Sequence, residues 1–203
     1  MDKTNTRDTI FKTAVVLFSR KGYHGTSVRD IAREVGIKES SLYNHFNGKE
    51  AILDGILAYQ MDVFDKAVHA LDALKSTDVD DLTDPVEFWM AGTREFLKYM
   101  DPTSGLISRI LINEMYLNQK CREFYLDTMT KARKDLVKAL FSEMRKKEMI
   151  RDCGIEMTAD HYVYLLQGLE IEHTLRELDG EDPGVLKNEL IGHITLFIQG
   201  LAQ

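Results

Sequence analysis

Proline, cysteine and long apolar runs are all scarce in this sequence of 203 residues. Its two cysteines, Cys121 and Cys153, lie far apart and lack the spacing of metal ligands, which argues against a cysteine-based metal site. No uncharged apolar run approaches the ~18 residues that a membrane helix needs, so we expect that the chain is not an integral membrane protein. The stretch from Met1 to Asp8 is polar with no apolar run behind it, and with so few cysteines we expect a protein of the reducing cytoplasm.

Strand-like alternation of Val, Ile and Thr is also hard to find, whereas apolar residues recur at spacings of three and four. The chain contains only three prolines to interrupt such stretches. We therefore predict an all-α protein. Beyond residue 48 the expected helices span residues 49–75, 85–100, 105–118, 122–147, 159–178 and 183–201.

The charge is distributed unevenly along the chain, whose net charge is −7. Residues 1–50 hold nine Lys and Arg against six Asp and Glu, a balance of +3. The remaining residues hold 17 against 27, a balance of −10. Such asymmetry is a hint of a nucleic-acid-facing module joined to a different one.

The first fifty residues have the layout of a helix-turn-helix. A first helix, over residues 6–21, ends at Gly22. Ser27 and Asp30 stand at capping-box spacing at the start of a second, which Gly36 ends. A third helix over residues 38–45 follows after a turn of about three residues.

This third helix is too short and too polar to be stable alone in water. We expect Ile37, Leu42 and Phe46 to anchor it on the other two helices. Its polar face is then free for a partner.

The stretch from Thr26 to Leu53, "TSVRDIAREVGIKESSLYNHFNGKEAIL", resembles the DNA-binding signature of the tetracycline-repressor (TetR) family of prokaryotic transcriptional regulators. The likeness rests on a capping Thr/Ser, a V-x-x-I-A core, the turn glycine, L-Y-x-H-F, and the Lys-Glu pair that opens the next helix. Weaker similarity continues through "RILINEMYLNQKCREFY" and "FSEMRKKEMIRDCG". One departure is Lys38, where the family often has Ser or Thr as helix cap. Here the cap must come from backbone or water, and the added charge is available to phosphate.

The resemblance implies a DNA-binding transcriptional regulator rather than an enzyme. It implies a helix-turn-helix DNA-binding domain over residues 1–48 and a larger helical effector-binding and dimerisation domain over residues 49–203. The implied partners are double-stranded operator DNA, a small-molecule effector and a second copy of the chain, with no cofactor and no membrane. We expect a ligand-responsive repressor that binds a palindromic operator and is released by a small apolar or aromatic effector.

The expected DNA contacts lie on the third helix and at the starts of the second and fourth. Asn44 can pair with adenine, Ser40 and Ser41 can meet a base edge or phosphate, and Tyr43 and His45 suit phosphate. Helix starts offer free amides to phosphate oxygens. The full candidate set is Thr26, Ser27, Arg29, Lys38, Glu39, Ser40, Ser41, Tyr43, Asn44, His45 and Lys49.

An effector pocket and a dimer interface are expected in the rest of the chain. Nine methionines suit an adaptable apolar surface. The candidate pocket residues are Phe64, Trp89, Phe96, Met100, Met115, Tyr116, Tyr125, Met129 and Tyr162. Apolar stripes on the last two helices favour a two-helix-per-subunit dimer bundle through Leu165, Leu169, Leu186, Leu190, Ile194, Phe197 and Leu201.

Two other functions compete with this interpretation. The first is a helical enzyme or metal protein, for which Glu170 and His173 supply one E-x-x-H pair; di-iron proteins use two, and the sequence holds no second. No Ser/His/Asp set, phosphate loop or paired metal motif is found, so we expect no catalytic residues and no metal. The second is a protein-binding adaptor that uses residues 85–147.

Overall fold

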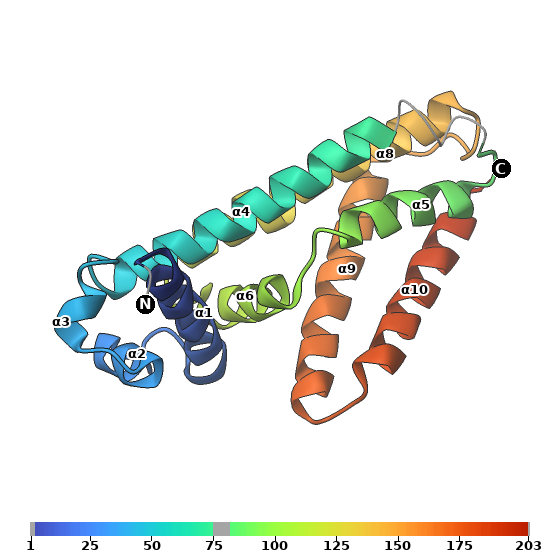
Figure 1. Ribbon diagram of the computed structural model, residues 1–203. Helices are drawn as coiled ribbons and strands as arrows, with labels where there is room; N and C mark the ends of the chain where they lie inside the picture. Colours follow the sequence, from blue (N-terminus) through green and yellow to red (C-terminus); the bar gives the residue numbers. More distant parts are fainter. Residues whose placement is uncertain (1–2, 75–81, 203) are drawn as a thin grey trace. The chain divides into compact units, whose positions relative to one another are not determined.

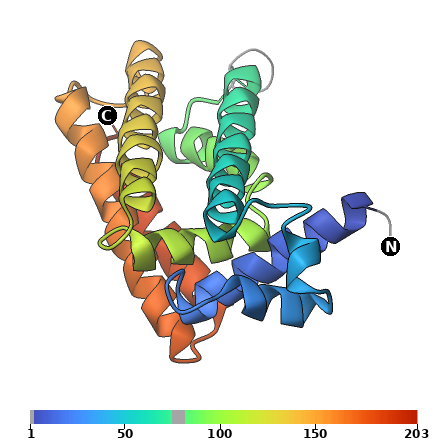
Figure 2. The ribbon, with the colours of Figure 1, turned by 90° about the vertical axis from the view of Figure 1, so that its left-hand side faces the viewer.

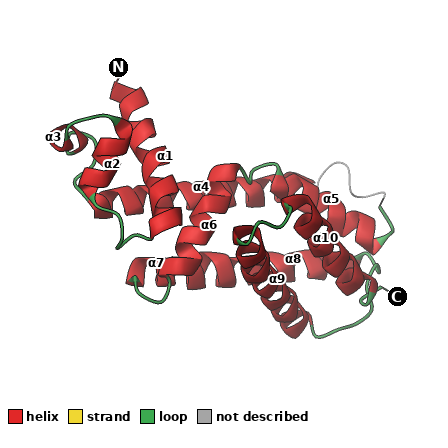
Figure 3. Ribbon diagram, turned by 90° about the horizontal axis from the view of Figure 1, so that it is seen from below, coloured by secondary structure: helices red, strands yellow, loops and turns green. Residues whose placement is uncertain are grey.

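The computed structural model describes residues 3–74 and 82–202, and within these ranges helices joined by loops make up the chain, with no strand (Figure 3). The prediction of an all-α fold is confirmed. None of the described helices is long and apolar enough to cross a membrane. The helices are α1 (Lys3–Lys21), α2 (Val28–Val35), α3 (Glu39–Leu42), α4 (Lys49–Leu74), α5 (Pro85–Leu97), α6 (Pro102–Glu114), α7 (Gln119–Phe124), a π-helix η1 (Tyr125–Ala132), α8 (Arg133–Lys146), α9 (Ile155–Leu178) and α10 (Pro183–Gln199).

Two predicted helices differ from the observed ones by more than a shift of up to four residues at their ends. The third is only one turn long, and three turn residues replace the rest of the predicted span 38–45. The predicted helix 122–147 is divided into α7, η1 and α8, because π-helical hydrogen bonding widens its middle. Residue 75, the predicted end of the fourth helix, lies outside the described residues.

Each proline of the chain begins a helix, and an aspartate precedes it. Pro85, Pro102 and Pro183 occupy the first turns of α5, α6 and α10. At α5 and α6 the side chain of the preceding aspartate accepts a hydrogen bond from the backbone N–H three residues on, at 2.8 Å in both. A proline at this position loses no helical hydrogen bond, so the few prolines mark helix starts rather than interruptions.

The described chain divides into two compact units. One comprises the residues up to Lys66 together with Tyr99–Tyr125, and the other comprises Ala67–Lys98 and Leu126 onward. Helix α4 is continuous from Lys49 to Leu74 and so contributes to both. The functional division at residue 48 into DNA-binding and effector domains stays a prediction.

The first unit buries α3 through a few large side chains. Leu42 is fully buried and Phe46 is 5% exposed, as predicted for the anchors of this helix, whereas Ile37 is only half-buried. Burial of two such side chains is worth about 3 to 6 kcal/mol, which exceeds what a single helical turn could supply by itself. Helix α1 packs on α2 and on α6 in the same unit (Figure 2, blue and yellow-green).

The second unit is built on aromatic side chains from α5, α8 and α9. Trp89 stacks on Phe141 at 4.8 Å between ring centroids, and Tyr162 meets Trp89 edge-on at 4.9 Å. Helix α8 packs on α9, and α10 lies beside α9 (Figure 1). These helices enclose the cavity described below.

Candidate nucleic-acid interface and buried cavity

Most of the side chains predicted to contact DNA lie on the surface of the first unit. Ser27, Arg29, Lys38, Glu39, Ser40, Tyr43 and Asn44 are exposed, while Ser41, His45 and Lys49 are half-buried. Lys38 is the residue before α3 and makes no side-chain capping bond, as its side-chain chemistry predicts. The short helix and the turn after it thus carry a polar surface of uncommitted side chains; that these contact DNA stays a prediction.

Helix α2 begins with a complete capping box. The backbone N–H of Asp30 donates to the Ser27 hydroxyl at 3.1 Å, and the Asp30 carboxylate accepts from the Ser27 backbone N–H at 3.0 Å. The Ser27 hydroxyl also donates to this carboxylate at 2.6 Å, and these bonds hold the pKa of Asp30 below its usual range. Gly36 ends the helix with φ of 77°, a backbone conformation that favours glycine.

Thr26 is a correction to the predicted contact set. Its side chain is 1% exposed, and its hydroxyl donates to the backbone oxygen of Gly22 at 3.0 Å. A buried hydroxyl that already has an acceptor cannot reach a phosphate. Thr26 instead holds the turn between α1 and α2, and Ser27 alone supplies the cap.

Lys49 has an internal role that the sequence did not reveal. Its ammonium donates to the backbone oxygens of Tyr23 and Thr26, at 2.8 and 3.0 Å, and lies 4.2 Å from the centre of the Tyr23 ring. Two of its three donor hydrogens are therefore committed to the α1–α2 turn. Lys49 therefore clamps this turn, and its predicted phosphate contact, for which one donor hydrogen is left, stays a prediction.

A second side chain holds the same turn from α6. Glu114 is 4% exposed, and its Oε1 accepts the backbone N–H of Tyr23 at 2.7 Å. Its Oε2 is buried and has no hydrogen-bond partner among the described residues, with His24 Nε2 at 4.0 Å. The backbone N–H of Tyr23 therefore donates a hydrogen bond to Glu114 of α6, and its backbone oxygen accepts one from Lys49 of α4.

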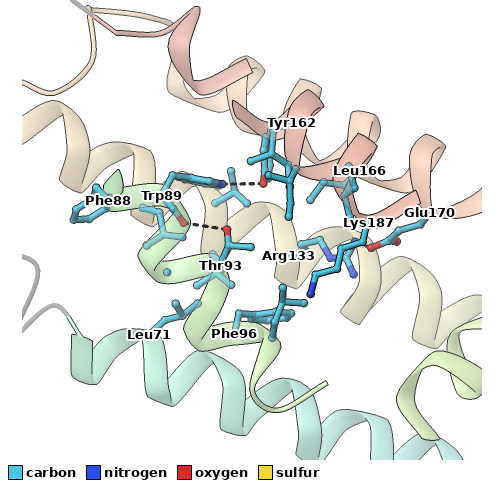
Figure 4. A pocket seen from close by; sticks show the side chains of 18 residues that line it. Leu71, Phe88, Trp89, Thr93, Phe96, Arg133, Tyr162, Leu166, Glu170 and Lys187 are labelled. Atoms are coloured by element: carbon cyan, nitrogen blue, oxygen red, sulfur yellow. Dashed lines mark hydrogen bonds and ion pairs between the residues drawn. The ribbon is translucent and has the colours of Figure 1, made fainter. Parts of the chain in front are cut away.

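The second unit contains an apolar cavity of about 180 Å³ (Figure 4). Its walls come from the end of α4, from α5, α8, α9 and α10. Trp89 and Tyr162 form part of the wall, and the indole N–H donates to the Tyr162 hydroxyl at 2.9 Å. Burial raises the pKa of Tyr162 well above its usual value, so this phenol stays protonated.

Three charged side chains reach the cavity. Arg133, Glu170 and Lys187 lie together at the end remote from Phe88 and Trp89 (Figure 4). Arg133 Nη1 donates to Glu170 Oε1 at 2.9 Å, with the arginine side chain only 13% exposed. Arg133 is the first residue after the π-helix η1, whose backbone oxygen at Met129 accepts from Gln167 at 3.3 Å.

The predicted pocket residues are only partly brought together. Trp89, Phe96 and Tyr162 line this cavity. The others do not: Met129 is buried elsewhere in the second unit, and the remaining five belong to the first unit, Phe64, Met100, Met115, Tyr116 and Tyr125. The prediction rests on aromatic and methionine side chains, whereas leucine and isoleucine are the largest group in the cavity wall and no methionine lines it. The wall also contains charged side chains that no apolar stripe indicates.

The predicted dimer residues of α10 also need correction. Leu186, Ile194 and Leu201 are at most 8% exposed in a single chain, and Leu190 lines the cavity. Leu186 and Ile194 of α10, and Leu201 just after it, therefore pack inside their own unit rather than on its surface, whereas the half-buried Leu190 stays a candidate. Leu165, Leu169 and Phe197 are half-buried and stay candidates.

The two residues of the E-x-x-H pair on α9 face different side chains. Glu170 bonds Arg133, and His173 Nε2 lies 3.9 Å from Glu189 Oε2. No group of three or more potential metal ligands occurs in the described ranges.

Comparison with known proteins assigns the N-terminal part of the chain. Residues 10–56 match the family model described as bacterial regulatory proteins, tetR family. The biofilm operon icaADBC HTH-type negative transcriptional regulator IcaR of Staphylococcus aureus (strain Newman) is 50% identical over 48 residues, which are 24% of this chain and 26% of that protein. This chain thus matches about a quarter of the length of its curated relatives.

Solved structures resemble the whole chain. A transcriptional regulator from Saccharomonospora viridis in complex with choline has a TM-score of 0.70 at 22% identity, over 99% of this chain and 100% of that one. The ketosteroid transcriptional regulator KstR2 of Mycobacterium tuberculosis has a TM-score of 0.67 at 17% identity, over 100% and 97%. At these identities the likeness shows the fold alone. Residues 10–56 therefore form a domain of the kind that the tetR family model describes, and the chain as a whole shares the fold of these solved structures.

Proposed function

We propose that this chain is a sequence-specific DNA-binding transcriptional regulator of the repressor type, with a homodimer as its working form. The observation that carries the proposal is the exposed polar surface of α3 and the turn after it, next to a capped α2, within residues 10–56 that match the family. A short helix held by burial while its polar side chains stay uncommitted fits a recognition element in the major groove. IcaR, the relative similar over this stretch, is named a negative transcriptional regulator.

The proposed dimer uses exposed apolar side chains of α9 and α10. Tyr164, Leu175 and Leu178 on α9 and Val185 and Leu196 on α10 are each at least 51% exposed. Apolar side chains left exposed on two neighbouring helices suit an interface between copies. A two-fold dimer requires a near-palindromic operator, because each half-site meets the same surface.

The proposed effector site is the cavity of the second unit. Helix α4 begins with the Lys49 clamp on the α1–α2 turn and continues as far as Leu71, which lines the cavity. One continuous helix thus contacts the α1–α2 turn near its first residue and the cavity near its last turn. An effector promotes release only by binding the released state more tightly than the DNA-bound state, and DNA must then weaken effector binding by the same factor.

The test is a titration of the chain against DNA from upstream of its own gene. Fluorescence anisotropy of the labelled duplex should show binding that survives excess unrelated DNA and weakens steeply with salt. Asn44→Ala should change the base preference by ~1 to 3 kcal/mol. Equal affinity for the upstream duplex and an unrelated duplex of the same length would refute the proposal, and a monomer in sedimentation at micromolar concentration would refute the dimer.

A further inference from the structure

The cavity of the second unit is polar at one end only. Its deep wall contains Phe88, Trp89 and Val137, which are at most 5% exposed. At the other end Lys187 is exposed and the Glu170 side chain is 42% exposed, so this end faces solvent. The Lys187 side chain extends over the cavity toward Phe96 (Figure 4).

The charged end holds more donors than acceptors. Lys187 makes no hydrogen bond or ion pair with any described residue, and Arg133 uses a single nitrogen, Nη1, toward Glu170. A guanidinium carries five N–H donors, so most of those of Arg133 stay available. The Tyr162 hydroxyl already accepts from Trp89, which leaves its own hydrogen to donate. Against these donors stands one carboxylate, that of Glu170, already paired.

The volume limits the apolar part of a ligand. The cavity measures about 180 Å³. An apolar protein cavity of about 150 Å³ accommodates benzene, so this one accepts a single ring or a chain of similar bulk. Larger polycyclic bodies do not fit without rearrangement of the walls.

From this arrangement we infer that the cavity takes a small amphiphilic acid, with one apolar ring or short chain against Trp89 and a carboxylate between Arg133 and Lys187. The inference rests on the proposed function in treating this cavity as the effector site. A carboxylate suits the site because it presents only acceptors, and charge-assisted bonds to a guanidinium and an ammonium are the stronger kind. A neutral or cationic ligand of the same shape leaves the donors unmatched, and a cation meets two like charges.

Three probes of one shape separate these cases: phenylacetate, phenylacetamide and 2-phenylethylammonium at neutral pH. Trp89 is the only tryptophan of the full chain, so its fluorescence reports on this cavity alone. We expect phenylacetate to bind at least about tenfold more tightly than phenylacetamide, as the gain of one charge-assisted bond implies, and 2-phenylethylammonium to bind more weakly than either.

Two variants with the same change of charge give the control. Lys187→Gln removes the ammonium at the cavity, and Lys146→Gln removes one from an exposed lysine of the same unit that does not line it. Lys187→Gln should reduce the preference for the acid over the amide by about fivefold to tenfold and leave the amide affinity unchanged. Lys146→Gln should leave both unchanged.

Equal binding of acid and amide overturns the inference, and so does the tightest binding by the cation, since Glu170 would then govern the site. No response of Trp89 to any probe up to about 10 mM overturns it as well. DNA binding measured without probe separates failure of this inference from failure of the proposed function. Normal operator binding with no preference for the acid refutes this inference alone. Absence of operator binding refutes the proposed function, whatever the probes show.

Discussion

Replacement of Lys49 by methionine tests how the part of the first unit that is proposed to face DNA is held. The ammonium donates to the backbone oxygens of Tyr23 and Thr26, at 2.8 and 3.0 Å, and lies over the Tyr23 ring. Methionine keeps an unbranched apolar chain of similar length and removes the charge and the donors. The change therefore isolates the clamp from the packing of the side-chain stem.

The magnitude follows from the contacts that are lost. A hydrogen bond to a charged group contributes about 1.5 to 3 kcal/mol, and we take about half of the lower end for each because the side chain is half-buried. The contact with the ring adds about 0.5 kcal/mol. We expect the free energy of unfolding to fall by about 2 kcal/mol, which lowers the midpoint of thermal unfolding by roughly 4 to 8 °C for a chain of this size.

Lys38→Met is the matched control, because the Lys38 side chain is exposed and makes no capping bond. Urea unfolding should give Lys38→Met the stability of the unmodified chain. In DNA titrations over a range of salt, Lys38→Met should flatten the slope of log affinity against log salt by about one unit, as loss of one phosphate contact does. Lys49→Met should leave that slope unchanged and weaken operator binding by less than about tenfold, since it acts through the turn.

The clamp is refuted if the two variants exchange these properties. A Lys49→Met protein as stable as the unmodified chain, with a flatter salt slope, would mean that the ammonium leaves the backbone oxygens to contact phosphate. The prediction from the sequence would then be right and the clamp unimportant.

Further predictions concern other contacts of the first unit. Glu114→Ala should lower the free energy of unfolding by about 1 to 3 kcal/mol because the part-buried N–H of Tyr23 loses its acceptor, while Glu114→Gln keeps an acceptor and should stay within about 1 kcal/mol in the same urea titration. Gly36→Ala should cost about 1 kcal/mol, since φ of 77° strains any side chain although no atom lies within 4 Å of the added one; a neutral effect would contradict this. The hydrogen bond to Asp101, aided by burial, raises the pKa of Tyr59 to about 12. Because the folded chain holds this proton above the pH of ~10 at which an unfolded tyrosine releases it, the stabilisation is complete below pH ~10 and is lost as the pH rises toward 12. Tyr59→Phe lacks this contribution, so its deficit in stability should shrink between about pH 10 and about pH 12, and a constant difference would argue against the bond.

Local features of the sequence determined the helices and their ends. The recurrence of apolar residues at three and four positions predicted most of the helical spans, since a buried stripe needs only neighbours within the same helix. The Ser27–Asp30 box and Gly36 were identifiable because capping depends on residues three or four apart and on the backbone freedom of glycine. The match over residues 10–56 agrees with the family that the same stretch resembles.

Tertiary structure alone decided what each buried face packs against. The apolar periodicity of α10 indicated that Leu186 and Ile194 are buried, but it carried no information on whether the partner is the same chain or a second copy. At the α1–α2 turn, the backbone N–H of Tyr23 donates to Glu114, 91 residues away. In the cavity wall, the Trp89 indole N–H donates to the Tyr162 hydroxyl, 73 residues away. Contacts of this kind depend on how helices pack, which no spacing within one helix records. For the same reason the charges of Arg133 and Lys187, which bear on the choice of ligand, became visible only when the fold placed them at one end of a cavity.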